Sequence, residues 1–297
     1  MPILADSNSR IIVQGITGRE ASVFTKESIQ YGAQIVAGVT PGKGGQTIHN
    51  VQVFDTVQAA KQSHKADATV IAVPAPFVRD AALEALAAEI KLLVIVTERI
   101  PRRDVVTIIE NATQQDARVI GPNTLGVISP NRTRIGMCGG NAKDVRRAYM
   151  QGPVGIMSRS GGMMTEIANQ LTQSGIGEST CVSIGGDPIV GSTFLDLLPL
   201  YEKDQETKSL VLFCEPGGTM EERLSEYLNA NSCRLPIVAF IAGRFADRMQ
   251  GIRFGHAGAI VERGRGSPSD KARLLRNSGV YVAEKLSDIP QLVKENT

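Results

Sequence analysis

The sequence predicts an α/β protein of two domains, each built on a parallel, doubly wound sheet. Short apolar runs alternate with helical stretches along most of the chain, which is the spacing of β-α units. Many of the 30 glycines gather where apolar runs end, as expected for loops at the edge of such a sheet. With 297 residues and 42% hydrophobic content, the chain can bury two cores of modest size.

Apolar runs in the first half predict strands, and the stretches between them predict helices. The runs are rich in aliphatic and β-branched residues and end at Gly, Pro or Thr, which is typical of buried strands. Thr56 can cap the helix that follows it. The predicted strands are 11–13, 35–39, 51–54, 68–73, 92–96 and 118–120, and the predicted helices are about 21–31, 56–63, 77–89 and 104–113.

The stretch 131–152 interrupts this alternation, because it is polar and contains glycine. We therefore expect a first domain at 1–130, a junction at 131–150 and a second domain at 151–297. The alternation resumes in the second half. Its predicted strands are 154–157, 181–184, 209–213 and 236–241, and its predicted helices end near 173, 201 and 230.

Composition excludes several classes of protein. The net charge is only +2, with acids and bases well mixed, so we expect neither nucleic acid nor a membrane surface as a partner. No signal or transit peptide is evident, and no apolar run approaches the roughly 20 residues of a membrane span. The four cysteines and three histidines lack disulfide or metal-ligand spacing. We expect no metal and a cytoplasmic location, or an organelle matrix if the source is eukaryotic.

Two glycine-rich loops in the first half are candidate anion sites. Residues 14–20 join a predicted strand to a helix, whose first N–H groups and dipole attract anions. Residues 40–45 place Lys43 among glycines, where it could reach a phosphate. Neither loop is a dinucleotide fingerprint or a P-loop, so we expect no nucleoside triphosphate site in this chain. A plain tight turn and a flexible turn are the alternatives.

The second half repeats the pattern with Ser158-Arg159-Ser160-Gly161-Gly162, again between a strand and a helix. Backbone N–H groups and two hydroxyls could bind an anion there. An ordinary serine N-cap is the alternative.

His256 lies among small residues in Phe254-Gly255-His256-Ala257-Gly258-Ala259 and is sterically accessible. Imidazole is nucleophilic near neutral pH, provided that a carboxylate fixes its tautomer. Glu215, at the end of another predicted strand, is the best candidate for that carboxylate. A histidine with no role on the surface is the alternative.

All these loops follow predicted strands, so they share the carboxyl edges of the sheets, where open α/β sheets bind ligands. In this order they resemble the α subunits of succinyl-CoA synthetase (succinate–CoA ligase), from about residue 5 to 290. The matching stretches are Gln14-Gly15-Ile16-Thr17-Gly18, Val39-Thr40-Pro41-Gly42-Lys43-Gly44-Gly45, Val73-Pro74-Ala75-Pro76-Phe77, Thr97-Glu98, Gly121-Pro122-Asn123, Ser158-Arg159-Ser160-Gly161, Ile184-Gly185-Gly186-Asp187-Pro188, Glu215-Pro216-Gly217-Gly218 and Gly255-His256-Ala257-Gly258-Ala259.

The resemblance implies a Rossmann-like domain that binds coenzyme A, followed by a flavodoxin-like ligase domain. It implies that His256 is phosphorylated and that Glu215 orients it. The implied CoA contacts are Thr17, Gly18, Arg19, Glu20, Pro41, Lys43, Val73, Val96, Thr97, Glu98 and Asn123. The implied phosphate-binding residues are Ser158, Ser160, Gly161 and Gly162, and Thr165 lies near the acid substrate.

The resemblance also implies a partner, an ATP-grasp β subunit that binds Mg-ATP or Mg-GTP in a heterodimer or heterotetramer. The implied reaction belongs to the tricarboxylic acid cycle. It forms an acyl phosphate from a nucleoside triphosphate and a small di- or tricarboxylate, passes the phosphoryl group through His256, and ends when the CoA thiol attacks the acyl phosphate. Charge stabilisation by helix dipoles and backbone N–H groups would be the main physical requirement.

Several positions depart from the succinate-specific pattern. Thr165 replaces a tyrosine, Thr124-Leu125 replaces Cys-Pro, and Pro216 replaces isoleucine. Other motifs look closer to ATP-citrate lyase and citryl-CoA synthetase. Succinate is therefore the expected acid, citrate and malate are alternatives, and a non-catalytic CoA-binding module is a further one.

Overall fold

The computed structural model describes residues 3–248, 256, 259, 261 and 266–297. Its contacts divide the chain into two compact units. The N-terminal unit comprises residues 4–146 with 189–191, and the C-terminal unit comprises mainly 147–188 and 192–297. The division thus falls after Arg146, and the expected domain limits of 1–130 and 151–297 stay a prediction.

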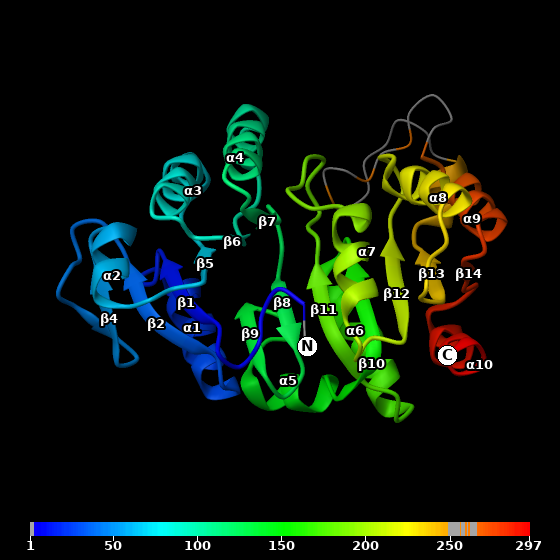
Figure 1. The fold of residues 1–297 in the computed structure, drawn as a ribbon, viewed down its shortest axis with the longest axis horizontal. Helices are drawn as coiled ribbons and strands as arrows, with labels where there is room; N and C mark the ends of the chain where they lie inside the picture. The colour runs from blue at the N-terminus through cyan, green and yellow to red at the C-terminus, as the bar shows by residue number, and fades with distance from the viewer. Residues whose placement is uncertain (1–2, 249–255, 257–258, 260, 262–265) are drawn as a thin grey trace. The chain divides into compact units, whose positions relative to one another are not determined.

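The N-terminal unit is built on a sheet whose strand order is β3-β4-β2-β1-β5-β6-β7 (Figure 1). Its strands are β1 (Arg10–Gln14), β2 (Gln34–Val39), β3 (Thr47–Ile48), β4 (Val51–Phe54), β5 (Ala68–Ile71), β6 (Leu92–Ile95) and β7 (Arg118–Ile120). The helices between them are α1 (Arg19–Tyr31), α2 (Val57–Ser63), α3 (Val78–Ala87), which follows the short 3₁₀ helix η1 (Ala75–Phe77), and α4 (Arg102–Gln114).

The strands of this unit form because their residues are apolar without interruption. Ile11, Ile12 and Val13 in β1 are fully buried, as parallel strands covered on both faces require. Thr56 caps α2 by accepting a hydrogen bond from the Ala59 N–H at 3.1 Å, as the sequence predicts. The predicted strand 68–73 ends earlier, at Ile71, because the chain turns toward Pro74, the N-cap residue of η1.

Strand order in this sheet creates a ligand-binding edge. β1 pairs in parallel with β2 on one side and with β5 on the other. The chain therefore winds away from β1 in both directions, and the loops after β1 and β5 diverge at the carboxyl edge. Crevices in open α/β sheets form at such switch points.

The C-terminal unit repeats this arrangement with parallel strands in the order β14-β13-β12-β10-β11 (Figure 1). These are β10 (Gln151–Ser158), β11 (Glu178–Ser183), β12 (Ser209–Cys214), β13 (Ile237–Ile241) and β14 (Tyr281–Val282). The helices are α6 (Gly161–Gln173), α7 (Phe194–Lys203), α8 (Met220–Ala230), α9 (Pro268–Asn277) and α10 (Ile289–Asn296), with 3₁₀ helices η2 (Arg244–Arg248) and η3 (Leu286–Asp288). Here the switch point lies at β10, between β11 and β12.

The stretch 131–152, where the sequence predicts a junction between domains, contains regular structure. This part of the chain contains β9 (Thr133–Gly136), which pairs antiparallel with β8 (Gly126–Ser129), and the helix α5 (Ala142–Ala148). Arg134, in the middle of β9, is a charged residue that the strand buries completely. Its guanidinium donates to the Cys138 and Gly140 carbonyls at 2.9 and 2.6 Å, so the charged group is hydrogen-bonded where it is buried.

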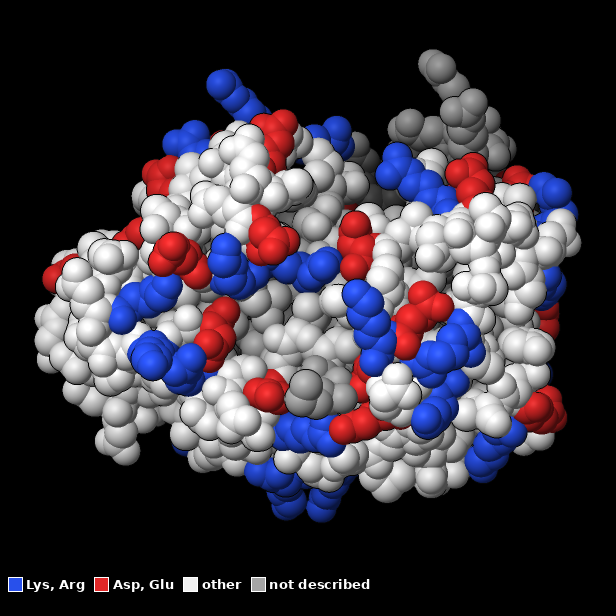
Figure 2. Space-filling view, in the orientation of Figure 1, with Lys and Arg blue, Asp and Glu red and all other residues white. Residues whose placement is uncertain are grey.

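Among the described residues, each sheet has seven strands, because β8 and β9 complete the second sheet. Both sheets are mostly parallel, which confirms the predicted α/β class. The pairing of β3 with β4 is antiparallel, as is that of β8 with β9, so both sheets are mixed rather than purely parallel. Within that same part of the chain, no helix is long and apolar enough to cross a membrane. Figure 2 shows Lys and Arg interspersed with Asp and Glu on the visible face, as the small net charge of +2 suggests.

Glu178, at the start of β11, is a carboxyl group that the fold holds in a buried place. It accepts hydrogen bonds from the Met150 N–H at 3.1 Å and the Thr172 hydroxyl at 3.3 Å. Burial raises the pKa of Glu178 to about 9, and these two bonds oppose the rise. The folded protein therefore keeps this proton at neutral pH, whereas the unfolded chain, with a pKa near 4.5, releases it.

We expect Glu178→Gln to stabilise the C-terminal unit at pH 8 by roughly 1–3 kcal/mol and to change little at pH 5. Between pH 4.5 and 9 the unfolded state of the wild type binds fewer protons than the folded state, so stability falls as pH rises. The glutamine amide does not titrate, so the variant lacks this dependence of the free energy of unfolding on pH. Urea denaturation at several pH values measures it, and exposed Glu226→Gln is the control. Equal pH slopes for the wild type and Glu178→Gln would contradict the assignment.

Candidate functional site

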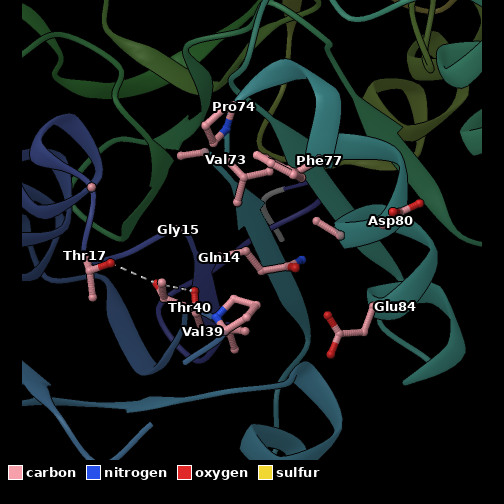
Figure 3. A pocket seen from close by; sticks show the side chains of 14 residues that line it. Gln14, Gly15, Thr17, Val39, Thr40, Val73, Pro74, Phe77, Asp80 and Glu84 are labelled. Carbon is pink, nitrogen blue, oxygen red and sulfur yellow. Dashed lines mark hydrogen bonds between the residues drawn. The ribbon is translucent and has the colours of Figure 1, made fainter. Parts of the chain in front are cut away.

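A hollow of about 610 Å³ lies at the carboxyl ends of β1, β2 and β5 in the N-terminal unit (Figure 3). Loops after these strands form one wall, and the start of α3 forms the other. Figure 3 shows Thr17 and Glu84 on opposite sides of the opening. The lining residues are Gln14, Gly15, Thr17, Gly18, Val39, Thr40, Pro41, Ala72, Val73, Pro74, Phe77, Asp80, Ala81 and Glu84.

Gly15 makes this hollow possible by its backbone conformation. Its φ is +83°, and a Cβ there would lie 2.7 Å from the Ala72 carbonyl oxygen. The loop after β1 can therefore approach the loop after β5 only if residue 15 is glycine. The Thr17 hydroxyl donates to the Thr40 hydroxyl at 3.2 Å, which joins the loops after β1 and β2.

A second hollow of about 440 Å³ adjoins the first, because both are lined by Gly18, Ala72, Val73 and Pro74. It opens over the first turn of α1 and the end of β6. The Thr97 hydroxyl donates to the Val73 carbonyl at 2.7 Å and so fixes the two strand ends to each other. The other lining residues are Arg19, Glu20, Ala21, Phe24, Val96, Thr97, Glu98 and Met137.

The structure brings most of the implied CoA contacts to these two hollows. The residues that line one or both are Thr17, Gly18, Arg19, Glu20, Pro41, Val73, Val96, Thr97 and Glu98. Lys43 lines neither, but belongs to an exposed turn in which the Gly44 N–H donates to Asp55 at 2.9 Å. Asn123 lines neither, and its backbone N–H donates to the Thr97 carbonyl at 3.0 Å.

In the C-terminal unit, His256 and Glu215 form a hydrogen-bonded pair. The Nδ1 atom of His256 lies 2.8 and 2.9 Å from the two carboxylate oxygens of Glu215, the residue that follows β12. The histidine side chain is 31% exposed and the glutamate side chain 13%, so the carboxylate is sheltered while the ring reaches solvent. Phe254, Gly255, Ala257 and Gly258, which surround His256 in the predicted motif, lie outside the described residues.

The surroundings of His256 favour its charged form. The hydrogen bond that His256 donates to Glu215 raises the pKa of His256 above 6.5, while partial burial and Arg159 oppose the rise and Asp187 adds to it. The ring packs against the backbone of Gly186, where a Cβ would lie 2.6 Å from the ring carbons. Glycine at 186 is therefore what gives the imidazole room in this position.

The N-terminus of α6 lies on the same sheet edge, after β10. Ser160 is its N-cap, and the Ser160 hydroxyl accepts from the Met163 N–H at 3.4 Å. The Ser158 hydroxyl accepts from the Ser160 N–H at 3.1 Å and donates to the Ser160 carbonyl at 2.5 Å. Gly161 and Gly162 begin the helix. The serine N-cap that the sequence offers as an alternative is therefore present, and the anion site stays a prediction.

Arg159 and Gly186 have no predicted role of their own, yet both lie close to the histidine: Gly186 packs against its ring, and the charge of Arg159 lowers its pKa. Buried Arg159 donates to the Asp187 carbonyl at 3.1 Å, so the end of β10 is tied to the loop after β11 that carries Gly186. Position directly after a strand is the one signal in the sequence that could have indicated them. Packing of a ring on a glycine backbone leaves no sequence pattern.

Thr165, on the second turn of α6, makes two hydrogen bonds. Its hydroxyl lies 2.9 Å from the hydroxyl of buried Tyr149 and 3.3 Å from the Gly161 carbonyl. The Thr165 side chain is therefore held by the chain itself. Its contact with an acid substrate stays a prediction.

Comparisons with known proteins agree with this geometry. The CoA binding domain family matches residues 6–99, and the CoA-ligase family matches residues 157–283. The α subunit 1 of the ADP-forming succinate–CoA ligase of Archaeoglobus fulgidus is 45% identical over 98% of this chain and 97% of its own length. A subunit of an ADP-forming sulfoacetate–CoA ligase from Acholeplasma sp. is 40% identical over 99% of this chain and 98% of its own length.

A solved structure of ATP citrate lyase from Methanothrix soehngenii, in complex with citrate and coenzyme A, superposes with a TM-score of 0.90 at 26% identity. The match covers 99% of this chain and 50% of that chain. Identity of 45% across nearly the full length of both proteins confirms the resemblance seen in the motifs. The chain belongs to the α-subunit family of NDP-forming succinate–CoA ligases, which are acid–thiol ligases.

Proposed function

We propose that this chain binds CoA in its N-terminal unit and carries a transient phosphohistidine at His256, as the α subunit of a ligase that forms succinyl-CoA. The observation that supports this most is the contact of the His256 Nδ1 atom with both oxygens of Glu215, at 2.8 and 2.9 Å. The reaction converts succinate, CoA and a nucleoside triphosphate into succinyl-CoA, a nucleoside diphosphate and phosphate.

The Glu215 contact determines which ring nitrogen reacts. A carboxylate beside Nδ1 keeps the proton on that nitrogen in the neutral imidazole, so Nε2 carries the lone pair. Nε2 attacks the terminal phosphorus of the nucleotide, and the bond from that phosphorus to the departing diphosphate breaks. The positive charge that develops on the ring is stabilised by Glu215. The phosphoryl group then passes to the substrate carboxylate, which regenerates neutral His256.

Positive groups beside the histidine would stabilise the migrating phosphoryl group. The N-terminus of α6 offers the N–H groups of Gly161 and Gly162 and the positive end of the helix dipole. Ser158 and Ser160 fix the loop that leads into this helix, and Arg159 adds a buried positive charge. Such preoriented donors act without reorganisation when charge develops, which is the main source of catalysis in phosphoryl transfer.

The two hollows of the N-terminal unit fit CoA. Their volumes of about 610 and 440 Å³ adjoin at Gly18 and Val73, so together they suit a long ligand with a nucleotide at one end. The first hollow is walled by Val39, Pro41 and Phe77, and the second includes the helix start at Arg19. We propose that these residues hold CoA, with Lys43 on its phosphate and Asn123 nearby. Bound CoA supplies the thiol that becomes the thioester.

The nucleotide site belongs to the partner in this proposal. Relatives of this chain are named as α subunits, which implies a β subunit. We propose that this subunit is an ATP-grasp protein that binds Mg-ATP or Mg-GTP and forms a hetero-oligomer with the chain. The proposed setting is the tricarboxylic acid cycle in the cytoplasm.

We expect His256→Asn to abolish phosphorylation by the β subunit and ATP, and we expect the wild-type rate to rise with pH through the raised pKa of His256. Protonated Nε2 has no lone pair to donate, so the rate follows the neutral imidazole. Glu215→Gln should move that midpoint to lower pH and reduce the plateau rate by about 10- to 100-fold. The amount of acid-labile, base-stable phosphoryl label on the chain measures the product.

His49→Asn is the control for this experiment, since it changes a histidine in the other unit and asparagine tolerates the left-handed φ of 50° there. Retention of the label in His256→Asn would exclude the phosphohistidine.

We expect Ala81→Phe to weaken CoA binding by about tenfold or more, because Ala81 lines the larger hollow and a benzyl group there would occupy space that the ligand needs. Ala87→Phe makes the same change on an exposed position of the same helix and serves as the control. Calorimetric titration of the isolated chain with CoA measures both. Equal affinity in the two variants would place CoA elsewhere.

We expect the complex with its β subunit to use succinate in preference to citrate, malate and sulfoacetate, by about tenfold or more in kcat/KM. The 45% identity with a succinate–CoA ligase supports this order, while the sulfoacetate–CoA ligase relative at 40% makes sulfoacetate the main competitor. Thr165→Val keeps the shape of the side chain and removes its hydroxyl. If Thr165 contacts the acid, this variant raises KM for the acid and leaves KM for CoA unchanged.

A further inference from the structure

Lys271, on α9, is a charged residue completely buried in the C-terminal unit. Its side chain has an exposed fraction of 0%. The ammonium donates to the Gly217 carbonyl at 2.6 Å and to the Glu221 carboxylate, and it lies 3.7 Å from a carboxylate oxygen of Glu222. A lysine is almost never buried to this extent unless it is paired, because removal of an ammonium from water costs several kcal/mol.

The partners of Lys271 belong to the segment that carries Glu215. Gly217 is two residues after Glu215, and Glu221 lies in the first turn of α8, which follows the same loop. The buried ammonium therefore connects the Glu215 turn to the helix after it. This one ammonium donates hydrogen bonds to both the carbonyl of the turn and the carboxylate of the helix.

The Glu215 turn, residues 215–218, has a backbone that needs such fixation. Gly217 and Gly218 both have left-handed φ values, +80° and +64°. The Gly217 N–H donates to the Gly266 carbonyl at 2.8 Å, and a Cβ on Gly266 would lie 2.8 Å from the Gly217 Cα. On the other side Pro216 packs against Gly243, where a Cβ would lie 2.6 Å from the proline ring. The contacts with Gly266 and Gly243 and the hydrogen bond from the ammonium thus all constrain this turn.

We propose that Lys271 is a positioning residue for His256: through the Gly217 carbonyl and Glu221, its buried ammonium fixes the turn that aims the Glu215 carboxylate at Nδ1. The proposal rests on the proposed function for its catalytic meaning. Contact of Nδ1 with both carboxylate oxygens at 2.8 and 2.9 Å requires that the backbone of residue 215 does not move.

Lys271 acts through geometry rather than through its charge on the histidine. The charged groups that shift the pKa of His256 most are Glu215, Arg159 and Asp187. Replacement of Lys271 should therefore affect His256 only by lengthening or misaligning its hydrogen bond with Glu215. That contact is the main cause of the raised pKa of His256, so its loss can be observed without any reaction.

The test uses Lys271→Met/Glu221→Met in the full chain. The single change Lys271→Met would leave the Glu221 carboxylate buried without its partner, whereas replacement of both ions by apolar groups of similar size is often neutral for stability. Arg273→Met is the matched control, since it makes the same kind of change on an exposed position of α9 that also forms an ion pair, with Asp270 at 2.8 Å. Gly266→Ala reaches the same turn by a steric route and keeps both charges.

The first measurement is the NMR titration of the His256 ring in the chain alone, with His49 and His64 as internal references. We expect the His256 midpoint to move toward 6.5 in the double variant and in Gly266→Ala, and to stay unchanged in Arg273→Met. The second is the rate of phosphorylation by the β subunit and ATP, which should fall by about tenfold in the same two variants while the affinity for CoA stays constant.

A wild-type titration midpoint in a folded double variant would overturn the positioning role, and so would a shift of equal size in Arg273→Met. Should the double variant fail to fold, an unshifted His256 in Gly266→Ala overturns it. If the wild-type chain is never phosphorylated, the proposed function fails while the titration still decides on Lys271.

Discussion

The chemistry proposed for this chain depends on one contact, between the Nδ1 atom of His256 and the carboxylate of Glu215. The two are 41 positions apart in the sequence, and the fold places Glu215 at the carboxyl edge of the sheet because it directly follows β12. The contact raises the pKa of His256. In the proposed reaction it also fixes the tautomer and leaves Nε2 as the reactive atom. Gly186 packs against the ring of this pair, Arg159 hydrogen-bonds the adjacent Asp187 carbonyl, and we propose that Lys271 fixes the turn that carries Glu215.

Glycine provides the close approaches on which both units depend. At Gly15 the loop after β1 passes within contact of the Ala72 carbonyl, and at Gly186 an imidazole lies directly on the backbone. Neither place would accept a Cβ without movement, so the ligand hollow and the histidine site have the same steric origin. The switch points of two doubly wound sheets determine where such loops occur, and glycine determines how near they come.

The sequence predicts these features unequally, for physical reasons. Strands such as β1 are predictable because burial on both faces requires an uninterrupted apolar run. The β8–β9 hairpin is not, because buried Arg134 also donates to the Ser28 hydroxyl at 3.2 Å, a contact 106 positions away that no local pattern reveals. In the site, Glu215 is a candidate from the sequence because it follows a predicted strand, and His256 is one because it lies among small residues. The packing of the ring on Gly186 appears only in three dimensions.

The surroundings of His256 balance two opposed requirements. A carboxylate on Nδ1 makes the imidazole a stronger nucleophile and stabilises the phosphorylated ring, but the same interaction raises the pKa and so increases the protonated, unreactive fraction near neutral pH. Arg159 opposes the rise, and it also supplies positive charge where a phosphoryl group would arrive. One buried guanidinium thus limits protonation of the nucleophile and favours its anionic reaction partner. In the proposed reaction, this dual effect accounts for a positive residue near a histidine that must lose a proton to react.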